Sequence, residues 1–279
     1  MHRIHVCAAL CALLFVPGLV AQSSSSTDMV VPAQSGNSAR LAKMQDGAGV
    51  TPFSRMALGG GISVGGVNLQ AAVNVSQHLN IRGVGNFFQH TVNDISTNGF
   101  NATGKINLAT AGVSLDYFPW ARHGFRLSPG VLFLNQNAIS GTMVAQGGTS
   151  FTLNDVTYYS SKANPVTGTA SLDLHSIKAS PTMTLGWGNM IPRNGGHWSF
   201  PVELGAAYTG KPNLAMALVS GKVCTDPAGT LNCQNVVGDP SLNANLQAEV
   251  AKDQKDLEPL RFYPVISFGV AFSFGKSVR

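Results

Sequence analysis

The chain has 279 residues, of which 44% are hydrophobic and only 11% are charged, and its formal net charge is +5. Charged residues make up about a quarter of an ordinary soluble protein, so this composition argues against a typical soluble globular domain. The basic residues are scattered singly and form no Lys/Arg run, so no basic patch for nucleic acid is expected.

The N-terminus has the layout of a secretory signal peptide. Arg3 is followed by the apolar stretch 6–16, by Pro17 and by the small residue Ala21. This stretch is shorter than the roughly 20 apolar residues that a membrane-spanning helix needs, and no later segment reaches that length. We therefore expect residues 1–21 to be a cleaved signal peptide and the mature chain to have no transmembrane helix.

The mature chain divides into a leader and one domain. Residues 22–53 are rich in serine and show no sustained apolar period, and such a segment cannot bury enough surface to offset its ordering entropy. We expect a flexible leader there and a single β domain over residues 54–279.

Alternation with period two begins after the leader. In residues 67–75 the odd positions are apolar and the even positions are mostly polar, which indicates a strand with one apolar and one polar face. The alternation returns in residues 109–117, 125–133 and 198–208. A water-soluble β protein would alternate in the same way, so a soluble secreted barrel stays an alternative at this point.

The alternating segments predict eight strands. Their expected spans are 55–62, 66–76, 79–92, 101–117, 124–140, 169–188, 197–218 and 260–274. The connections are alternately short and long, as periplasmic turns and extracellular loops are in membrane barrels. The short ones are 77–78, 119–123 and 191–196, and the long ones are 93–100, 140–168 and 219–259.

The last strand carries a recognisable motif. Large aromatic residues occupy one face and small residues the other, which suits a barrel wall in lipid. Its residues Ser267-x-Gly269-x-x-Phe272-x-Phe274 resemble the C-terminal assembly signal of outer-membrane barrels. The chain departs from that signal by continuing to Arg279 after the final aromatic.

Together with the signal peptide and the strand order, this motif makes the chain resemble the small eight-stranded bacterial outer-membrane barrels of the OmpA and OmpX kind, over about residues 55–274. The resemblance implies an all-β, antiparallel, up-and-down transmembrane barrel in the outer membrane of a Gram-negative cell. Outer-membrane lipid and the barrel-assembly machinery are the partners it implies. Trp120, Trp187 and Trp198 then lie beside predicted periplasmic turns, at a depth that aromatic rings favour.

A short amphipathic helix is expected in the last extracellular loop. Leu242, Leu246 and Val250 recur every four residues between 241 and 258, and Pro259 follows. This helix would make the loop an ordered cap, which is either a simple lid or a surface for an extracellular ligand.

Cys224 and Cys233 lie in the same loop and are predicted to form a disulfide, because disulfides persist in exported proteins. The loop 140–168 mixes aromatic and polar residues and is a second candidate surface.

Charged residues predicted to face the barrel lumen are the first candidates for a site. Arg82, Asp116 and Arg126 lie near the same end of consecutive predicted strands, so we expect Asp116 between the two arginines. Lys178 and Glu203 face inward on the next strands and extend the cluster. It is either a stabilising plug, because unpaired buried charge is costly, or a constriction that sets solute selectivity.

No residue pattern predicts catalysis, a metal site or a cofactor. His175 and Ser176 are adjacent, but neighbours on a strand point to opposite faces, so they cannot act as base and nucleophile. We expect a non-enzymatic outer-membrane barrel that is structural or engages extracellular partners through its loops. The alternatives are a narrow channel for small or hydrophobic solutes and, third, a lipid-modifying enzyme.

Overall fold

The computed structural model describes residues 51–120, 123–193 and 196–275. The predicted signal peptide and residues 22–50 of the predicted leader lie outside these ranges. Within them the chain is built from antiparallel strands, one α-helix and one short 3-10 helix. Neither helix is both long and apolar enough to cross a membrane.

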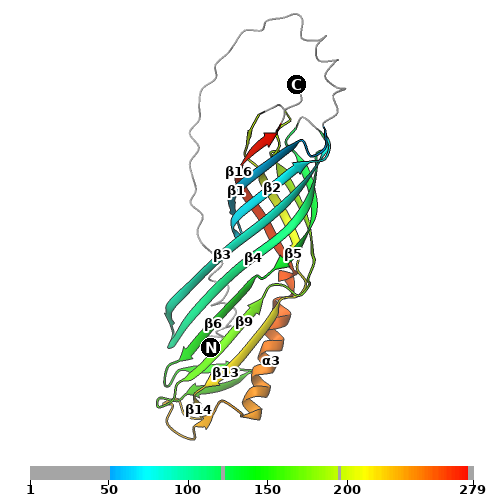
Figure 1. Ribbon diagram of the computed structural model, residues 1–279. Coiled ribbons are helices and arrows are strands. Elements are labelled where there is room, and N and C mark those ends of the chain that lie inside the picture. The colour runs from blue at the N-terminus through cyan, green and yellow to red at the C-terminus, as the bar shows by residue number, and fades with distance from the viewer. Residues whose placement is uncertain (1–50, 121–122, 194–195, 276–279) are drawn as a thin grey trace, which may run out of the picture.

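One set of strands pairs in a ring, which we call the strand ring (Figure 1). Its members are β1 (Arg55–Ser63), β2 (Gly66–Asn74), β3 (Leu79–Thr97), β4 (Phe100–Tyr117), β5 (Arg126–Asn135), β10 (Ser180–Trp187), β12 (Val202–Tyr208) and β16 (Phe262–Gly275). Each strand pairs with the next in this order, and β16 pairs with β1. The short strand β11 (Trp198–Ser199) adds to β16.

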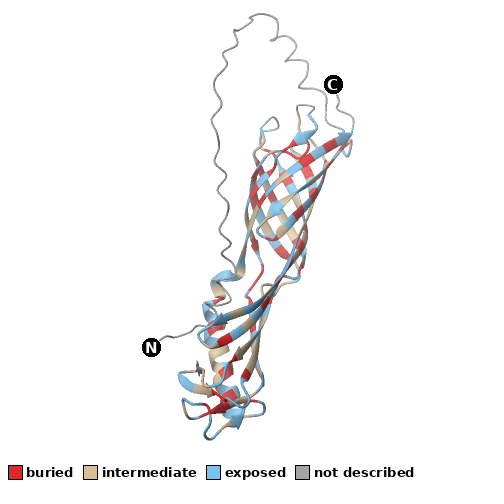
Figure 2. Ribbon diagram, turned by 90° about the vertical axis from the view of Figure 1, so that its left-hand side faces the viewer, coloured by how far each residue is buried: buried red, intermediate tan, exposed pale blue. Residues whose placement is uncertain are grey.

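Buried and exposed residues alternate along the strands of the ring (Figure 2). On β2 the polar residues Asn68, Gln70 and Asn74 are buried, whereas Val67 and Leu69 are exposed. The predicted alternation is confirmed, and its sense is the reverse of that in a soluble protein. Polar groups fill the interior, and apolar groups cover the outside.

Strands β3 and β4 continue beyond the strand ring and, with three further strands, form an extension of the same sheet, which we call the outer sheet. There β4 pairs with β6 (Ala138–Ala145), β6 with β9 (Val166–Asp173), and β9 with β13 (Asn213–Ser220). A small separate sheet contains β7 (Ser150–Leu153), β8 (Val156–Ser160), β14 (Lys222–Cys224) and β15 (Gln234–Asn235).

The expected helix is present as α3 (Pro240–Asp256), followed by the 3-10 helix η2 (Glu258–Arg261). Asp239 begins α3 because its carboxylate accepts hydrogen bonds from the backbone amides of Ser241 and Leu242. These bonds lower the pKa of Asp239, the one from Leu242 most. Buried Leu242 and Leu246 then pack against the outer sheet at Phe100, Ala145 and Val166.

The strand count differs from the prediction, because the described residues contain sixteen strands. The predicted strand 124–140 is broken after Asn135 into β5 and β6. The predicted strand 169–188 holds part of β9 and all of β10, and 197–218 holds β11, β12 and part of β13. Ring strands and outer-sheet strands alternate with the same period, so periodicity alone could not separate them.

Two predicted loops were also wrong. The segment 140–168 contains β7, β8 and parts of β6 and β9. The segment 93–100 is the tip of a long hairpin with a tight turn at Asn98 and Gly99, whose φ angles are 48° and 83°. An Asn-Gly pair is the usual signal for this turn, since both residues must adopt positive φ.

Because β1 and β16 are in close contact, a methyl group added at Gly61 should destabilise the protein, whereas one added at Gly60 should not. In Gly61→Ala the new methyl group would overlap the carbonyl oxygen of Phe268 and lie 2.6 Å from the Cα of Gly269. We expect the free energy of unfolding to fall by about 1–3 kcal/mol or more, measured by denaturant titration of the refolded protein in detergent.

The matched control is Gly60→Ala, whose methyl group would come no closer than 3.8 Å to Asn68 and Leu69. This variant should unfold at the same denaturant concentration as the parent, or slightly above it. Equal midpoints for the two variants would show that the β1–β16 contact is not tight.

Candidate functional site

Four charged side chains meet in the interior of the strand ring. Arg82 comes from β3, Asp116 from β4, Arg126 from β5 and Glu203 from β12. All four are at least 95% buried. We call them the charge cluster; it contains two positive and two negative groups, so it has no net charge.

Arg82 is the centre of the charge cluster. Its Nε lies 3.0 Å from Asp116 Oδ2, and its Nη1 and Nη2 donate to the two carboxylate oxygens of Glu203 at 2.8 and 2.7 Å. The guanidinium therefore makes a two-pronged ion pair with Glu203, the geometry in which Arg binds a carboxylate most strongly. Because Glu203 belongs to β12, this pair crosses the interior of the strand ring.

Two hydroxyl groups donate further hydrogen bonds to the carboxylates of the charge cluster. Ser128 donates to Asp116 at 2.7 Å, and Thr184 donates to Glu203. Each carboxylate thus accepts bonds from an arginine and a hydroxyl, as buried ions require.

Arg126 is held differently from Arg82. Its Nε lies 3.9 Å from Asp116 and its Nη2 lies 3.6 Å from Glu203, which are ion-pair distances but too long for hydrogen bonds. Its Nη1 donates to the backbone carbonyl of Gly188. Arg126 therefore connects the charge cluster to the segment that follows β10.

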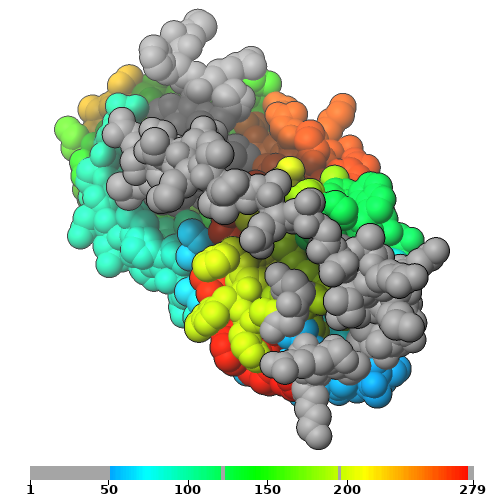
Figure 3. Space-filling view, turned by 90° about the horizontal axis from the view of Figure 1, so that it is seen from above, coloured from blue at the N-terminus to red at the C-terminus, as the bar shows by residue number. Residues whose placement is uncertain are grey.

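That segment closes one end of the strand ring. It covers residues 188–197, of which 188–193 and 196–197 are described, and we call it the plug segment. Met190 and Ile191 are fully buried and pack against three small interior residues, Ala57, Ala72 and Ala271. Figure 3 looks at the molecule from this end and shows yellow-green residues between the blue and red strands.

Polar side chains of the strand ring hold the plug segment in place. Asn80 donates to the Asn189 side chain at 2.9 Å and accepts from Arg193 at 2.8 Å. Arg55 donates to the backbone carbonyls of Pro192 and Gly196. The segment predicted to be a simple periplasmic turn is instead folded into the interior.

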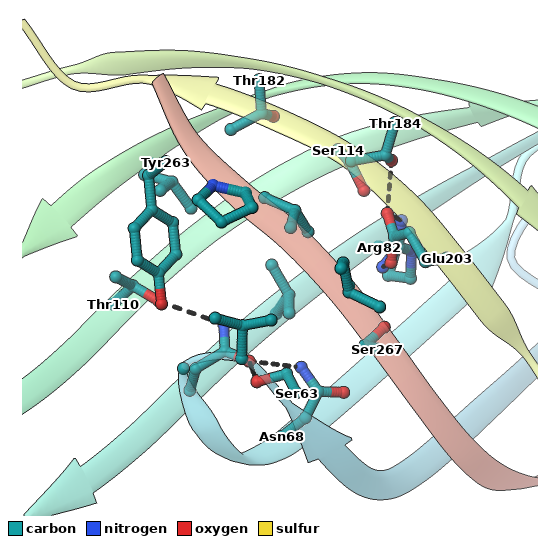
Figure 4. Close-up of a pocket in the computed structure, with 18 of the residues that line it drawn as sticks. Ser63, Asn68, Arg82, Thr110, Ser114, Thr182, Thr184, Glu203, Tyr263 and Ser267 are labelled. Carbon is teal, nitrogen blue, oxygen red and sulfur yellow. Dashed lines mark hydrogen bonds and ion pairs between the residues drawn. The ribbon is translucent and has the colours of Figure 1, made fainter. Parts of the chain in front are cut away.

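A narrow cavity lies on the other side of the charge cluster (Figure 4). Its volume is about 50 Å³, which is enough for a few water molecules. Arg82 and Glu203 lie at one end of it and Tyr263 at the other. The Tyr263 hydroxyl is buried and has no hydrogen-bond partner among the described residues.

The structure brings together four of the five predicted cluster residues. Lys178 is the exception: it lies between β9 and β10, outside the strand ring, and is exposed. The prediction failed because 169–188 was read as one strand, which turned Lys178 inward. His175 lies in the same connection, away from the charge cluster.

The remaining predicted residues lie where the sequence suggested. Cys224 and Cys233 form a disulfide, as expected. On β16, Ser267 is buried in the interior, whereas Phe272 and Phe274 face outward, and Phe272 packs edge-on against Trp198 at 5.0 Å.

Sequence reasoning missed the plug segment and the two hydroxyl partners Ser128 and Thr184. One signal was present, because the predicted turn 191–196 begins with Ile191, directly after Met190, and apolar residues rarely stay exposed in a turn. Nothing in the sequence indicated the hydroxyl partners, since Ser and Thr are common on the polar face of any strand.

Removing one member of the charge cluster should be costly. Arg82→Met leaves Asp116 and Glu203 facing Arg126 alone, and breaking a buried ion pair in this way costs about 3–5 kcal/mol. We expect a loss of this size in the free energy of unfolding, measured in detergent. Adding Glu203→Gln to the same chain restores charge balance and should recover part of the loss.

Lys211→Met is the matched control, because it removes an exposed ion pair in which Lys211 lies 2.7 Å from Glu258. Its unfolding midpoint should be nearly unchanged. If Arg82→Met were as stable as Lys211→Met, the charge cluster could not be a stabilising element.

Solved structures share this fold. The crystal structure of Acinetobacter baumannii CarO is 18% identical, with a TM-score of 0.51, and the match covers 80% of this chain and 98% of that chain. For CarO2 of the same organism the identity is 17%, the TM-score 0.54, and the coverage 81% and 100%. No family model and no curated protein sequence matches this chain. At these identities the likeness shows the fold alone.

Proposed function

We propose that this chain is a non-enzymatic outer-membrane protein that works by binding rather than by conduction or turnover. The strand ring would be a closed, eight-stranded transmembrane barrel with the plug segment at its periplasmic end. The outer sheet and α3 would then stand outside the cell and engage an extracellular partner.

The outer surface of the strand ring supports a position in lipid. Where β3 and β4 lie in the ring, at residues 79–87 and 109–117, and in the other six described ring strands, no outward-facing position is charged. Large apolar side chains are exposed all around this part of the strand ring. They include Leu58, Leu69, Ile81, Phe87, Val113, Leu115, Phe133, Met183, Leu185, Leu204, Phe268 and Val270. A soluble protein rarely exposes so large an apolar area.

Aromatic residues also support a position in the membrane, with the plug segment at one membrane interface. Trp120, Trp187 and Trp198 are each at least 60% exposed and lie at the plug end of the strand ring, where an aromatic girdle would meet the membrane interface. Phe272 and Phe274 on β16 add to this girdle. Their place in the last strand is consistent with recognition of the chain by the barrel-assembly machinery.

The observation that carries the proposal is the closed interior. The Arg82 and Glu203 ion pair crosses the ring, and the plug segment closes the end behind it. The cavity of about 50 Å³ lies beyond this pair. Because the ion pair and the plug segment both stand across the lumen, a solute would have no continuous path. In barrels with eight strands the interior is typically filled by the barrel's own side chains.

The chemistry of the charge cluster argues against turnover. Both carboxylates are engaged by arginine, and each also accepts a hydroxyl bond. Neither is therefore free to act as a general base, and a membrane-depth catalytic pair would need such a group.

Planar-bilayer conductance tests the proposal. The refolded protein, checked first for the heat-dependent gel mobility of a folded barrel, should give no steady channels. The reason is that both the charge cluster and the plug segment block the lumen. Steady single-channel openings from folded protein would contradict the proposal and favour the narrow channel.

The double variant Arg82→Ser with Glu203→Ser serves as a comparison, since it removes the cross-ring pair but keeps the plug segment. It should also be silent if both closures act. Channels in this variant alone would show that the charge cluster is the only barrier.

A further inference from the structure

The outer sheet has two different faces. One face packs against α3 and the neighbouring core, through residues such as Ile106, Ile139 and Leu172. The opposite face carries hydroxyl groups and one lysine at alternate positions of β4, β6 and β9. Figure 1 shows β6, β9 and β13 side by side, with α3 along them.

The polar side chains of this opposite face form two rows across the strands. Pairing places Thr103 beside Thr142 and Thr142 beside Thr169, which is the first row. The second row is Lys105, Ser140 and Ser171, in the same strand order. Neighbours in a row are about 5 Å apart, and the rows are about 7 Å apart because two residues separate them along each strand.

These six side chains line a shallow groove of about 400 Å³. Its floor continues onto β13, where Ala215 and Ala217 are too small to fill it. The strands beneath are held by backbone pairing on both sides of β6 and β9, so the groove is a rigid surface.

The six polar groups have no partners within the described part of the chain: no hydrogen bond or ion pair joins any of them to another described residue. The hydroxyls inside the strand ring contrast with them, since Ser128 and Thr184 are both bonded to carboxylates. The groove therefore offers five hydroxyls and one ammonium to a ligand.

We propose that this groove binds an extended saccharide chain that carries carboxylate groups. Rows of hydroxyls can both donate to and accept from sugar hydroxyls, and the Lys105 ammonium would pair with a carboxylate. The inference rests on the proposed function, because it names the class of partner that the outer sheet engages.

The groove favours a saccharide over a peptide. A peptide that adds to a sheet needs an unpaired strand edge or pockets for apolar side chains. The outer sheet has an edge at β13, but the six polar side chains stand on β4, β6 and β9, which are each paired on both sides. The one large apolar residue in the lining, Met216, packs its side chain into the core on the other face.

The charge of the groove favours an acidic sugar. Lys105 is the one charged residue among those that line it. Asp173 lies on the same face one row further along, where its neighbours on the adjacent strands are Ala138 and Asn213, and it does not line the groove.

Calorimetric titration of the refolded full chain in detergent tests the proposal. The probes are hexasaccharides of mannuronic acid and of galacturonic acid, with neutral mannohexaose as the uncharged counterpart. At least one acidic probe should bind at millimolar concentration, and the neutral probe should bind about tenfold more weakly, the factor that corresponds to one charged hydrogen bond.

Two variants locate the binding. Lys105→Met should weaken binding of the acidic probe about tenfold and leave the neutral probe unchanged. The triple change Thr103→Val, Thr142→Val and Thr169→Val keeps side-chain shape and strand propensity and should abolish binding of both. The matched control is Thr152→Val with Thr157→Val, an exposed cross-strand pair on β7 and β8 outside the groove, which should bind as the parent does.

Two results would overturn the proposal. One is folded parent protein that binds neither acidic probe, and the other is binding that survives both groove variants. Silent bilayers together with either result would reject the saccharide groove and leave the proposed non-conducting barrel intact. Steady channels from folded protein would reject the proposed function whatever the sugars do.

Discussion

The ion pair between Arg82 and Glu203 is the interaction on which the rest of the strand ring depends. It joins β3 to β12 across the interior, between strands that are far apart in the sequence and do not pair with each other. Two buried charges are tolerable only with this geometry, because desolvation must be offset by close, well-directed bonds. Asp116 and Arg126 are a second pair of opposite charges, and Ser128 and Thr184 each donate one more hydrogen bond to a carboxylate oxygen that already accepts from Arg82.

The charge cluster and the plug segment form one continuous closure. Arg126 connects them, since its guanidinium lies beside both carboxylates and donates to the backbone at Gly188. The plug segment in turn places Met190 and Ile191 against small residues of the wall. The small size of Ala57, Ala72 and Ala271 leaves the room into which this segment folds.

The two halves of the molecule use one pair of strands for different purposes. Near the plug, β3 and β4 are part of the strand ring, with polar side chains inside and apolar ones outside. Beyond it, the same strands continue into the outer sheet, where apolar side chains pack beneath α3 and polar ones remain exposed. This continuity ties the outer sheet to the ring without a flexible linker.

Much of the local structure could be predicted from the sequence, because it depends on local patterns. Alternation in residues 67–75 predicts the inner and outer faces of β2, four-residue spacing predicts α3, and the closely spaced pair Cys224 and Cys233 predicts the disulfide. The tertiary structure decided the features that depend on how the strands close into a ring. It brought Glu203 onto Arg82 from across the ring, moved Lys178 outside, folded the plug segment inward, and divided the strands between ring and outer sheet. Period-two alternation records which way a side chain points, whereas the partner it meets is set by strands that are distant in the sequence.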